Sequence, residues 1–450
     1  MTDTTLTPPS GKTSAPTPHK TTSILELDPL TRKRNAAEAR FKLYGIIAIG
    51  IGLFFLVALL WAILSNGLGA FSQTFLKVDV PLNQEQIAEA EKSVVKTSKY
   101  RAIIDDAFAK ELAGANITTD MSAKDLQKLF SSGAAATVRD FALANPDKIG
   151  STVTFELIAS SRVDGYLKGR VKREDLAEDK NLDAAHLDLA DQMQSAGILE
   201  KRFNWAFITG TDASDSRPEQ AGIGASMIGS LFMMLVVLFL SLPIGVAASI
   251  YLEEFAPQNK FTDLIEVNIS NLAAVPSIVF GILGLAVFIQ FMHLPQSAPL
   301  VGGLVLTLMT LPTIIISTRA SLKAVPPSIR DAALGIGASK MQSIFHHVLP
   351  LAMPGILTGT IIGLAQALGE TAPLLLIGMV GFIASNFPDG VAAGFFSPNS
   401  AMPAQIYEWA KRADPAFYER AWGGIIVLLV FLMTMNIIAI ILRRRFERRW

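Results

Sequence analysis

Long apolar stretches alternate with polar ones along this chain of 450 residues. A membrane-spanning helix needs about 20 mostly apolar residues, and five runs reach that length. These runs cover residues 43–64, 221–252, 267–318, 351–384 and 422–442. The third is too long for one helix, and the turn-forming sequence "HLPQSAP" (293–299) divides it into two spans. We therefore expect six spans, with the second of them broken at Pro243.

The N-terminal part predicts a tail followed by a membrane anchor. Residues 1–41 are rich in Thr, Pro, Ser and Lys, which is typical of a disordered segment. The first transmembrane helix, expected over 42–65, begins too late and is too long for a cleaved signal peptide. Basic residues before this span and the C-terminal "RRRFERRW" predict that both termini are cytoplasmic. The acidic inner loop "EEFAPQNKFTD" gives no support to this orientation.

Residues 66–218 differ from the rest of the chain because charged residues are frequent there. "NQEQIAEAEKSVVK" and "SAKDLQKLFSS" predict helices, and "STVTFELIAS" (151–160) predicts a strand. The following "SRVDGYLKGRVK" suggests a hairpin. We expect a soluble α+β domain between the first and second spans, on the extracytoplasmic side.

Composition excludes several kinds of site. Charged residues make up 17% of the chain, against about 25% in soluble domains, and the formal net charge is zero. A neutral chain gives no basic signal for nucleic acid. Cysteine is absent, so there is no disulfide framework and no thiol nucleophile, and the five scattered histidines show no zinc motif. We expect no catalytic residue, no metal site and no cofactor on this chain.

Residues 325–350 predict a helix, a glycine turn and a second helix between two spans. Pro327 can start the first helix, and Gly337 can end it in a left-handed turn. Ser339 and Gln342 form a capping box for the second, which Leu349-Pro350 is expected to close. These short helices need a partner surface to be stable. The partner is either the membrane surface or another protein.

The same loop, "DAALGIGASKMQSIFHHVLP" (331–350), resembles the EAA loop of ABC importer permeases. That family has Glu-Ala-Ala, then Gly after three residues, and then Ile, any residue and Leu-Pro after nine more. Here Asp331 replaces Glu, which keeps the charge, and His347 replaces Ile, which affects one apolar contact. The resemblance implies ATPase docking by Asp331, Ala332, Ala333, Gly337, Ala338, Leu349 and Pro350.

Further stretches between 221 and 450, half of the chain, resemble PstA-type phosphate permeases. They include "SLPIGVAASIYLEEFAP", "NLAAVPSIVFGILGLAVF", "GETAPLL" and "QIYEWAKRADPAFYERAW". The resemblance implies the type I (MetI-like) importer fold, with five spans in a permease domain over 219–450. It also implies a multi-pass protein of the inner membrane, whose residues 66–218 are periplasmic. The partners that it implies are membrane lipid, a PstC-like permease, two PstB-like ATPases carrying ATP and Mg, and a PstS-like phosphate-binding protein.

Glu370 is the one charged residue between Met341 and Pro388, inside an apolar run. One interpretation is structural, with the carboxyl group fixing a helix broken near Pro373. The other is a gate, because acids within membranes usually face a cavity or a partner. In the family pattern an Arg often stands four residues earlier, where this chain has Gln366. The candidate residues of a translocation path are Glu370, Thr371, Gln366, Arg319, Asn271 and Ser277.

Three functions fit this sequence to different degrees. The first is an ABC importer permease for phosphate, without an ATPase site of its own. The second is a permease for another oxyanion, such as sulfate or molybdate. The third is a receptor that senses a ligand through residues 66–218. A receptor requires a cytoplasmic signalling domain, for which the short inner segments leave no room, and it gives no reason for the EAA pattern.

Overall fold

The computed structural model describes residues 29–174, 182–379 and 388–446, which fall into two compact units, Met1–Ala62 and Ile63–Trp450. Most of the first unit is one long helix, α1 (Pro29–Gly67), which ends inside the second unit. Residues 29–41 are helical, so the prediction of a disordered tail is wrong for this part. The rest of that tail, residues 1–28, lies outside the described residues.

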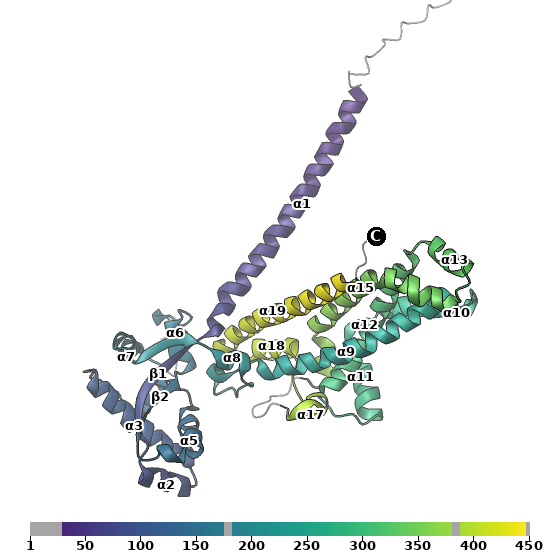
Figure 1. The fold of residues 1–450 in the computed structure, drawn as a ribbon. Helices are drawn as coiled ribbons and strands as arrows, with labels where there is room; N and C mark the ends of the chain where they lie inside the picture. Colours follow the sequence, from purple (N-terminus) through teal and green to yellow (C-terminus); the bar gives the residue numbers. More distant parts are fainter. Residues whose placement is uncertain (1–28, 175–181, 380–387, 447–450) are drawn as a thin grey trace, which may run out of the picture. The chain divides into compact units, whose positions relative to one another are not determined.

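Residues 72–203 form a small α/β structure around three antiparallel strands (Figure 1). The strands are β1 (Ser72–Pro81), β2 (Thr152–Ile158) and β3 (Leu199–Phe203), with β1 in the centre. In β1 every second side chain is buried, and Leu76, Val78 and Val80 are fully inaccessible. This period of two places one face of the sheet against the core.

The helices of this part surround the sheet, and buried side chains of α3, α5 and α7 share its core. The strand expected at 151–160 is confirmed as β2, but the expected hairpin after it is wrong, because a helix follows instead. The elements are η1 (Leu68–Phe71), α2 (Gln84–Lys92), α3 (Lys96–Gly114), α4 (Ala123–Leu126), η2 (Gln127–Leu129), α5 (Ala134–Ala144), η3 (Pro146–Lys148), α6 (Ser161–Leu167), α7 (Ala184–Ser195), α8 (Trp205–Thr209) and η5 (Pro218–Gln220).

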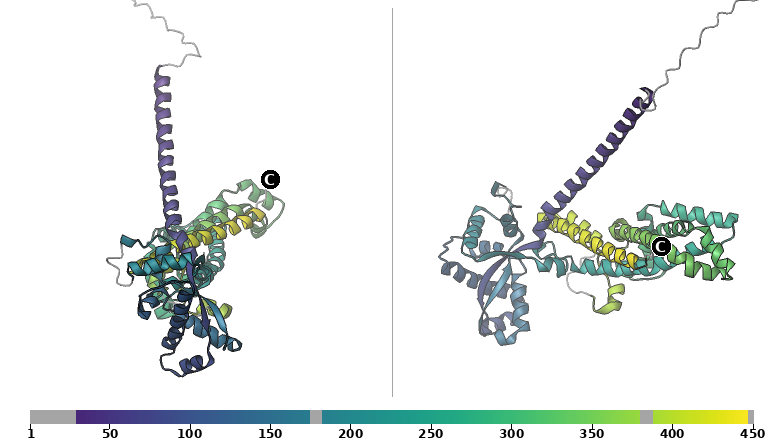
Figure 2. Two further views of the ribbon diagram at one scale, coloured as in Figure 1. Left: turned by 90° about the vertical axis from the view of Figure 1, so that its left-hand side faces the viewer. Right: turned by 45° about the horizontal axis from the view of Figure 1, so that its top comes forward.

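The remainder is an apolar helical bundle, whose long helices run side by side in both views of Figure 2. Within the described residues, five helices are long and apolar enough to cross a membrane, or six if one bent pair counts as a span. The elements are α9 (Gly224–Ile250), η6 (Tyr251–Phe255), α10 (Lys260–Ala273), α11 (Ser277–Gly284), η7 (Leu285–Phe291), α12 (Pro299–Lys323), α13 (Pro327–Gly335), α14 (Lys340–Ser343), η8 (Ile344–Val348), α15 (Leu349–Gly369), α16 (Ala372–Leu376), α17 (Gly390–Phe396), α18 (Met402–Lys411) and α19 (Pro415–Phe446).

At two prolines, the course of the helix differs from the one that the sequence predicts. Pro243 lies inside α9, which continues through it, so the predicted break is wrong. Neighbouring helices allow a membrane helix to contain proline. The unexpected break comes before Pro276, where α10 and the helix formed by α11 and η7 meet at 101°. A residue before proline disfavours helical backbone, so Val275 marks this bend in the sequence.

Glycines allow α12 to lie close to both of its neighbours. A Cβ atom added at Gly303 of α12 would stand 2.4 Å from the Cβ of Val236 in α9. Helix α15 runs antiparallel to α12, with Gly355 against Ser321 and Gly359 against Ser317. Small residues at such contacts are the usual way for membrane helices to approach, because van der Waals packing drives their association.

A buried polar cluster joins the sheet to the start of α19. The guanidinium of Arg420, 2% exposed, donates to the carbonyl oxygens of Ala70 and Glu219 at 2.9 Å and to Gln73 Oε1 at 2.7 Å. The carboxyl group of Glu219 accepts a hydrogen bond from Ser131, and burial raises the pKa of Glu219. Each of these buried polar groups has a hydrogen-bond partner in the protein in place of water. The sheet and the start of α19 are therefore joined by a fixed set of contacts.

The close contact at Gly303 gives a first prediction. Gly303→Ala is expected to destabilise the chain by about 1–3 kcal/mol, the usual cost of overpacking, because Val236 and the backbone of α9 have to move. Thermal unfolding in detergent measures this effect. The matched control is Gly363→Ala in α15, where the nearest atom would be 3.6 Å from the new Cβ and no loss is expected. Equal unfolding temperatures for the two variants would contradict the packing described here.

Candidate coupling loop and translocation-path residues

The loop at 325–350 has the predicted helix–glycine–helix form. Helix α13 starts at Pro327 and ends at Gly335, and Gly337 follows with a φ of +90°, a conformation that L side chains rarely adopt. The capping box is confirmed: the backbone N–H of Gln342 donates to Ser339 Oγ at 3.2 Å, and the N–H of Ser339 donates to Gln342 Oε1 at 2.8 Å. Both devices were readable from the sequence, because each depends on local backbone geometry alone.

The second helix does not end at Leu349-Pro350, so that prediction is wrong. Helix α14, the π turn η8 and helix α15 form one continuous helix from Lys340 to Gly369. Proline lacks the N–H for a regular helical bond, and its ring clashes with the carbonyl one turn earlier. The wider π turn comes directly before Leu349-Pro350, where local hydrogen bonding is already irregular. As a result, the second helix of the loop and the membrane helix α15 are parts of one continuous helix.

The apolar side chains of this loop divide between the interior and the surface. Ile344 and Val348 are buried against Leu322 of α12 and Ile250 of α9. Met341 and Phe345, at helical spacing from these two, are about half exposed. We define the loop face as the four exposed apolar residues Leu334, Ile336, Met341 and Phe345, with Ile336 83% exposed.

The residues predicted to dock an ATPase surround the loop face. Asp331, Ala332 and Gly337 are exposed, whereas Ala333 is buried; Ala338, Leu349 and Pro350 are half-buried. A cleft of about 720 Å³ opens beside them, between the end of α12, the start of α13 and the side chains of His346 and His347. The loop therefore presents apolar side chains, one carboxylate and a cleft on an accessible surface.

Arg330 attaches the first loop helix to two membrane helices. Its Nη2 is 2.7 Å from Glu254 Oε1, just after α9, in an ion pair whose carboxylate is almost buried. It also donates to the carbonyl oxygens of Leu322 and Val325 at 2.9 Å, which lie at the end of α12. The last carbonyls of a helix have no partner within it, so Arg330 both caps α12 and holds α13 to α9.

Arg319 belongs to the same group of charges. It donates to Glu266 of α10 at 2.7 Å and to Glu253 at 3.3 Å, and Lys323 lies 3.5 Å from Glu253. We call these side chains the loop ion cluster; its members are Glu253, Glu254, Glu266, Arg319, Lys323 and Arg330. Its acids and bases are equal in number, so Glu253 and Glu254 of the acidic inner loop are paired with basic side chains of the neighbouring elements. Sequence reasoning missed the roles of Glu253 and Glu254, although two adjacent acids at the end of a span were the signal.

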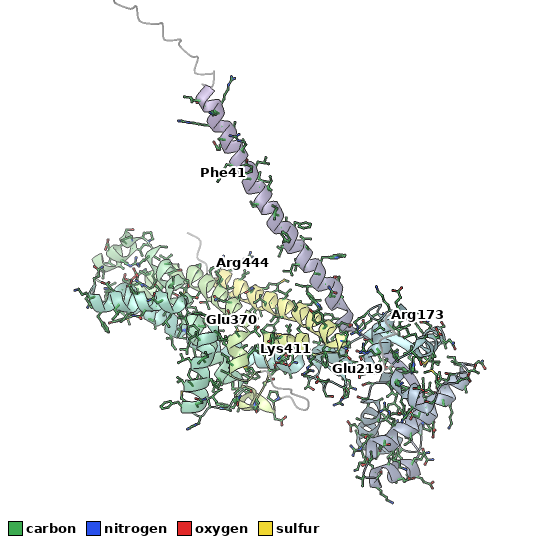
Figure 3. All side chains as sticks on the ribbon, turned by 180° about the vertical axis from the view of Figure 1, so that it is seen from behind. Phe41, Arg173, Glu219, Glu370, Lys411 and Arg444 are labelled. Atoms are coloured by element: carbon green, nitrogen blue, oxygen red, sulfur yellow. The ribbon has the colours of Figure 1, made fainter. Side chains whose placement is uncertain are left out.

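Glu370 lies directly after α15, where the helix breaks near Pro373 as predicted (Figure 3). Its side chain is half-buried, and within the described ranges it makes no hydrogen bond or ion pair. Gln366, one turn earlier on the same side of α15, is exposed. A carboxylate in an apolar helical run, without a partner among the described residues, is costly unless a cavity or another subunit faces it.

The path candidates do not all lie together. Gln366, Glu370 and Thr371 lie at the end of α15, and Ser277 begins α11, which packs beside α16 with Gly281 against Pro373. Asn271 lies on the other side of the bend, in α10. Arg319 lies level with the start of α15, near Gly355 and Gly359. Glu370 is about four helical turns beyond Gly355, roughly 20 Å along the axis, so Arg319 is not its counter-charge.

Two sequence families match this chain. A model described as "Binding-protein-dependent transport system inner membrane component" matches residues 241–450, and a domain of unknown function, DUF3333, matches residues 28–177. The phosphate transport system permease protein PstA 1 of Mycobacterium tuberculosis is 31% identical over 52% of this chain and 73% of that protein. PstA of Haemophilus influenzae is 28% identical, over 50% and 77%. The probable ABC transporter permease protein YqgI of Bacillus subtilis is also 28% identical, over 54% and 88%.

Among solved structures, an inward-facing form of the MetNI methionine ABC transporter matches with a TM-score of 0.39 and 16% identity, over 50% of this chain and 95% of that one. The assignment of this chain to a class of protein rests on the sequence relatives. These relatives and the family model show a permease subunit of an ABC importer, a multi-pass protein of the inner membrane that is a transporter component without an ATPase site of its own. The chain belongs to the PstA-type permeases within the binding-protein-dependent transport family, with an additional N-terminal domain.

The position of Arg330 gives a second prediction. Arg330→Gln removes the ion pair with Glu254 and weakens the cap on α12, so α13 should open more readily. Hydrogen bonds to charged groups contribute about 1.5–3 kcal/mol, so amide hydrogen exchange over residues 327–335 should rise by roughly tenfold or more. Lys323→Gln is the matched control, because its half-exposed ammonium only touches the rim of the loop ion cluster. Unchanged exchange in Arg330→Gln would exclude this anchor.

Proposed function

We propose that this chain is the permease subunit of an ATP-driven phosphate importer, and that it forms the translocation path together with a second, PstC-like permease. The observation that carries the proposal is the loop face, four exposed apolar side chains on a loop anchored to the ends of α9 and α12. Exposed apolar patches mark interaction sites, and a helix as short as α13 needs a partner surface. The partner that fits is an ABC ATPase subunit, which carries ATP and Mg.

The continuous helix from Lys340 to Gly369 suggests how ATP hydrolysis reaches the path. Closure of two PstB-like ATPase subunits would move the loop face, and the helix begun in the loop would carry this displacement to Glu370. The loop ion cluster ties the same motion to α9, α10 and α12. A rigid element with two positions is the physical requirement for alternating access.

The topology proposed with this function has six spans, with the bent pair α10 and α11 counted as one. Both termini and the coupling loop then lie in the cytoplasm, and residues 66–218 form the periplasmic domain inserted between the first two spans. A PstS-like phosphate-binding protein would deliver its ligand on that side.

Phosphate is the substrate favoured by the relatives, several of which are named as phosphate transport permeases. A carboxylate repels phosphate, so Glu370 serves the path by gating or by pairing with a cation. Gln366 occupies the position where a cation would help, and Arg319 is too distant. The counter-charge is therefore assigned to the second permease subunit, facing the exposed side of α15. Competition between phosphate and sulfate in an uptake assay separates phosphate from the other oxyanions.

A third prediction concerns ATPase docking. Gly337→Asp is expected to prevent co-purification of the ATPase and to abolish phosphate uptake, because an aspartate at a φ of +90° strains the turn and places a charge beside the loop face. Membrane insertion should be normal. The matched control is Gly150→Asp, a glycine with a φ of +96° and no neighbouring atom, far from this loop in the sequence. Normal co-purification together with normal uptake in Gly337→Asp would refute the docking role.

A fourth prediction concerns Glu370. Glu370→Gln keeps the shape of the side chain and removes its charge, so a gate that depends on charge should lose most of its phosphate uptake while the assembled complex still hydrolyses ATP. The comparison is Gln366→Glu, which adds a second carboxylate one turn away and should also lower uptake by repulsion. Wild-type uptake in Glu370→Gln would leave this residue a structural role only.

A further inference from the structure

A pocket of about 700 Å³ lies where the second unit meets the membrane boundary, and neither matched family assigns it a role. Ser65 and Asn66, directly after the apolar run of α1, line one side. Tyr418 and Trp422, directly before the apolar run of α19, line another. Tryptophan and tyrosine are enriched at the level of lipid headgroups, because their rings are apolar and their polar tips reach water. The pocket therefore opens at headgroup depth.

The floor of this pocket is a buried ion pair. Lys168 Nζ is 2.9 Å from Glu419 Oε1 and 2.5 Å from Asp164 Oδ2, and the side chains of Lys168 and Glu419 are less than one-tenth exposed. Asp164 is held in turn by the backbone N–H of Thr74 at 2.9 Å and by its hydroxyl at 2.8 Å. The floor thus has a fixed geometry that does not depend on an occupant.

The walls carry charges of both signs, with capacity for further hydrogen bonds. Arg170 lies 3.2 Å from Glu419 through Nε and donates from Nη2 to the carbonyl oxygen of Ser161, but its Nη1 has no hydrogen-bond acceptor among the described residues. Asp414, about one-quarter exposed, accepts from the N–H of Ala416 and lies 4.0 Å from Arg162. A buried guanidinium donor without an acceptor is expensive, so an anionic group from outside the chain is expected there.

We propose that this pocket binds the headgroup of a zwitterionic membrane phospholipid of the phosphoethanolamine type. The phosphodiester would accept a hydrogen bond from Arg170, and the primary ammonium would donate to Asp414. The acyl chains would leave past Tyr418 and Trp422 along α19. Charge-assisted hydrogen bonds of this kind are about twice as strong as neutral ones.

The charges of both signs that line the pocket distinguish a phosphoethanolamine headgroup from three related occupants. Inorganic phosphate would bring its charge next to Asp414 and Glu419 with no cation of its own, and it would leave the aromatic rim unused. A phosphocholine headgroup carries three methyl groups in place of the ammonium hydrogens, so it cannot donate to Asp414. A phosphoglycerol headgroup has no cation at all. Of these four, only phosphoethanolamine combines the anionic phosphodiester with a cation that can donate hydrogen bonds to Asp414.

The test uses the full-length chain, purified in detergent and exchanged into nanodiscs of phosphatidylethanolamine, phosphatidylcholine or phosphatidylglycerol. Native mass spectrometry after release from the nanodisc then counts the lipids that stay bound. The wild-type chain is expected to retain one phosphatidylethanolamine and several-fold less of the other two. Retention should fall about tenfold in Arg170→Gln, which loses a charge-assisted bond. The control Arg173→Gln, a nearby exposed arginine paired with Asp188 and Asp191, should behave as wild type (Figure 3).

A second variant keeps the test independent of folding. If Arg170→Gln fails to fold because Glu419 loses a partner, Asp414→Asn removes only the acceptor for the ammonium, and its amide oxygen can still accept from Ala416. The ratio of retained phosphatidylethanolamine to phosphatidylcholine should then fall towards one. Equal retention of the three lipids by the wild-type chain, an unchanged ratio in Asp414→Asn, or displacement of the lipid by inorganic phosphate in excess would each overturn the proposal.

Discussion

The ion pair between Arg330 and Glu254 is the interaction on which the functional end of this permease depends. An arginine beside an almost buried carboxylate at 2.7 Å has little freedom, and its other N–H groups are used by the carbonyls at the end of α12. A buried pair of this kind adds little net stability compared with apolar packing, but removing one partner is costly. Its contribution is therefore positional: it fixes the coupling loop to two membrane helices at once.

Close helix packing extends this arrangement across the membrane. Glycines let α12 lie close to both α9 and α15, and van der Waals contact replaces the hydrophobic effect that is missing within lipid. The helix from Lys340 to Gly369 then runs from the loop face to Glu370 without interruption. One element thus contacts the surface proposed for the ATPase and the place proposed for the gate, which makes them mechanically dependent on each other.

The N-terminal domain is attached by a different kind of interface. Its contacts with α18 and α19 include apolar ones, with Phe207 against Trp409. Beside them lie buried polar contacts, including Arg420 on three oxygen acceptors and Asp212 between Trp409 and Arg412. Such a network holds one geometry well because each donor has a particular acceptor. It also places charges of both signs beside the membrane boundary, which a purely apolar junction would not do, and the headgroup pocket results from this arrangement.

Local features were determined by the sequence itself. The left-handed Gly337, the capping box of Ser339 and the helix break at Glu370 each depend on one residue and its immediate neighbours, and each was found where the pattern placed it. The EAA spacing identified the loop for the same reason.

Tertiary structure decided which prolines interrupt a helix, because packing by other helices determines whether a proline is tolerated. The second loop helix continues through Pro350, α9 continues through Pro243, and the chain bends at Val275. Arg319 and Glu254 pair with residues far away in the chain, and the pocket beneath Tyr418 is lined by distant segments. The distance between Arg319 and Glu370 is likewise set by the packed helices. Such pairings exist only once the helices have packed, because Coulomb attraction and hydrogen bonds act over distances in space that the order of residues does not specify.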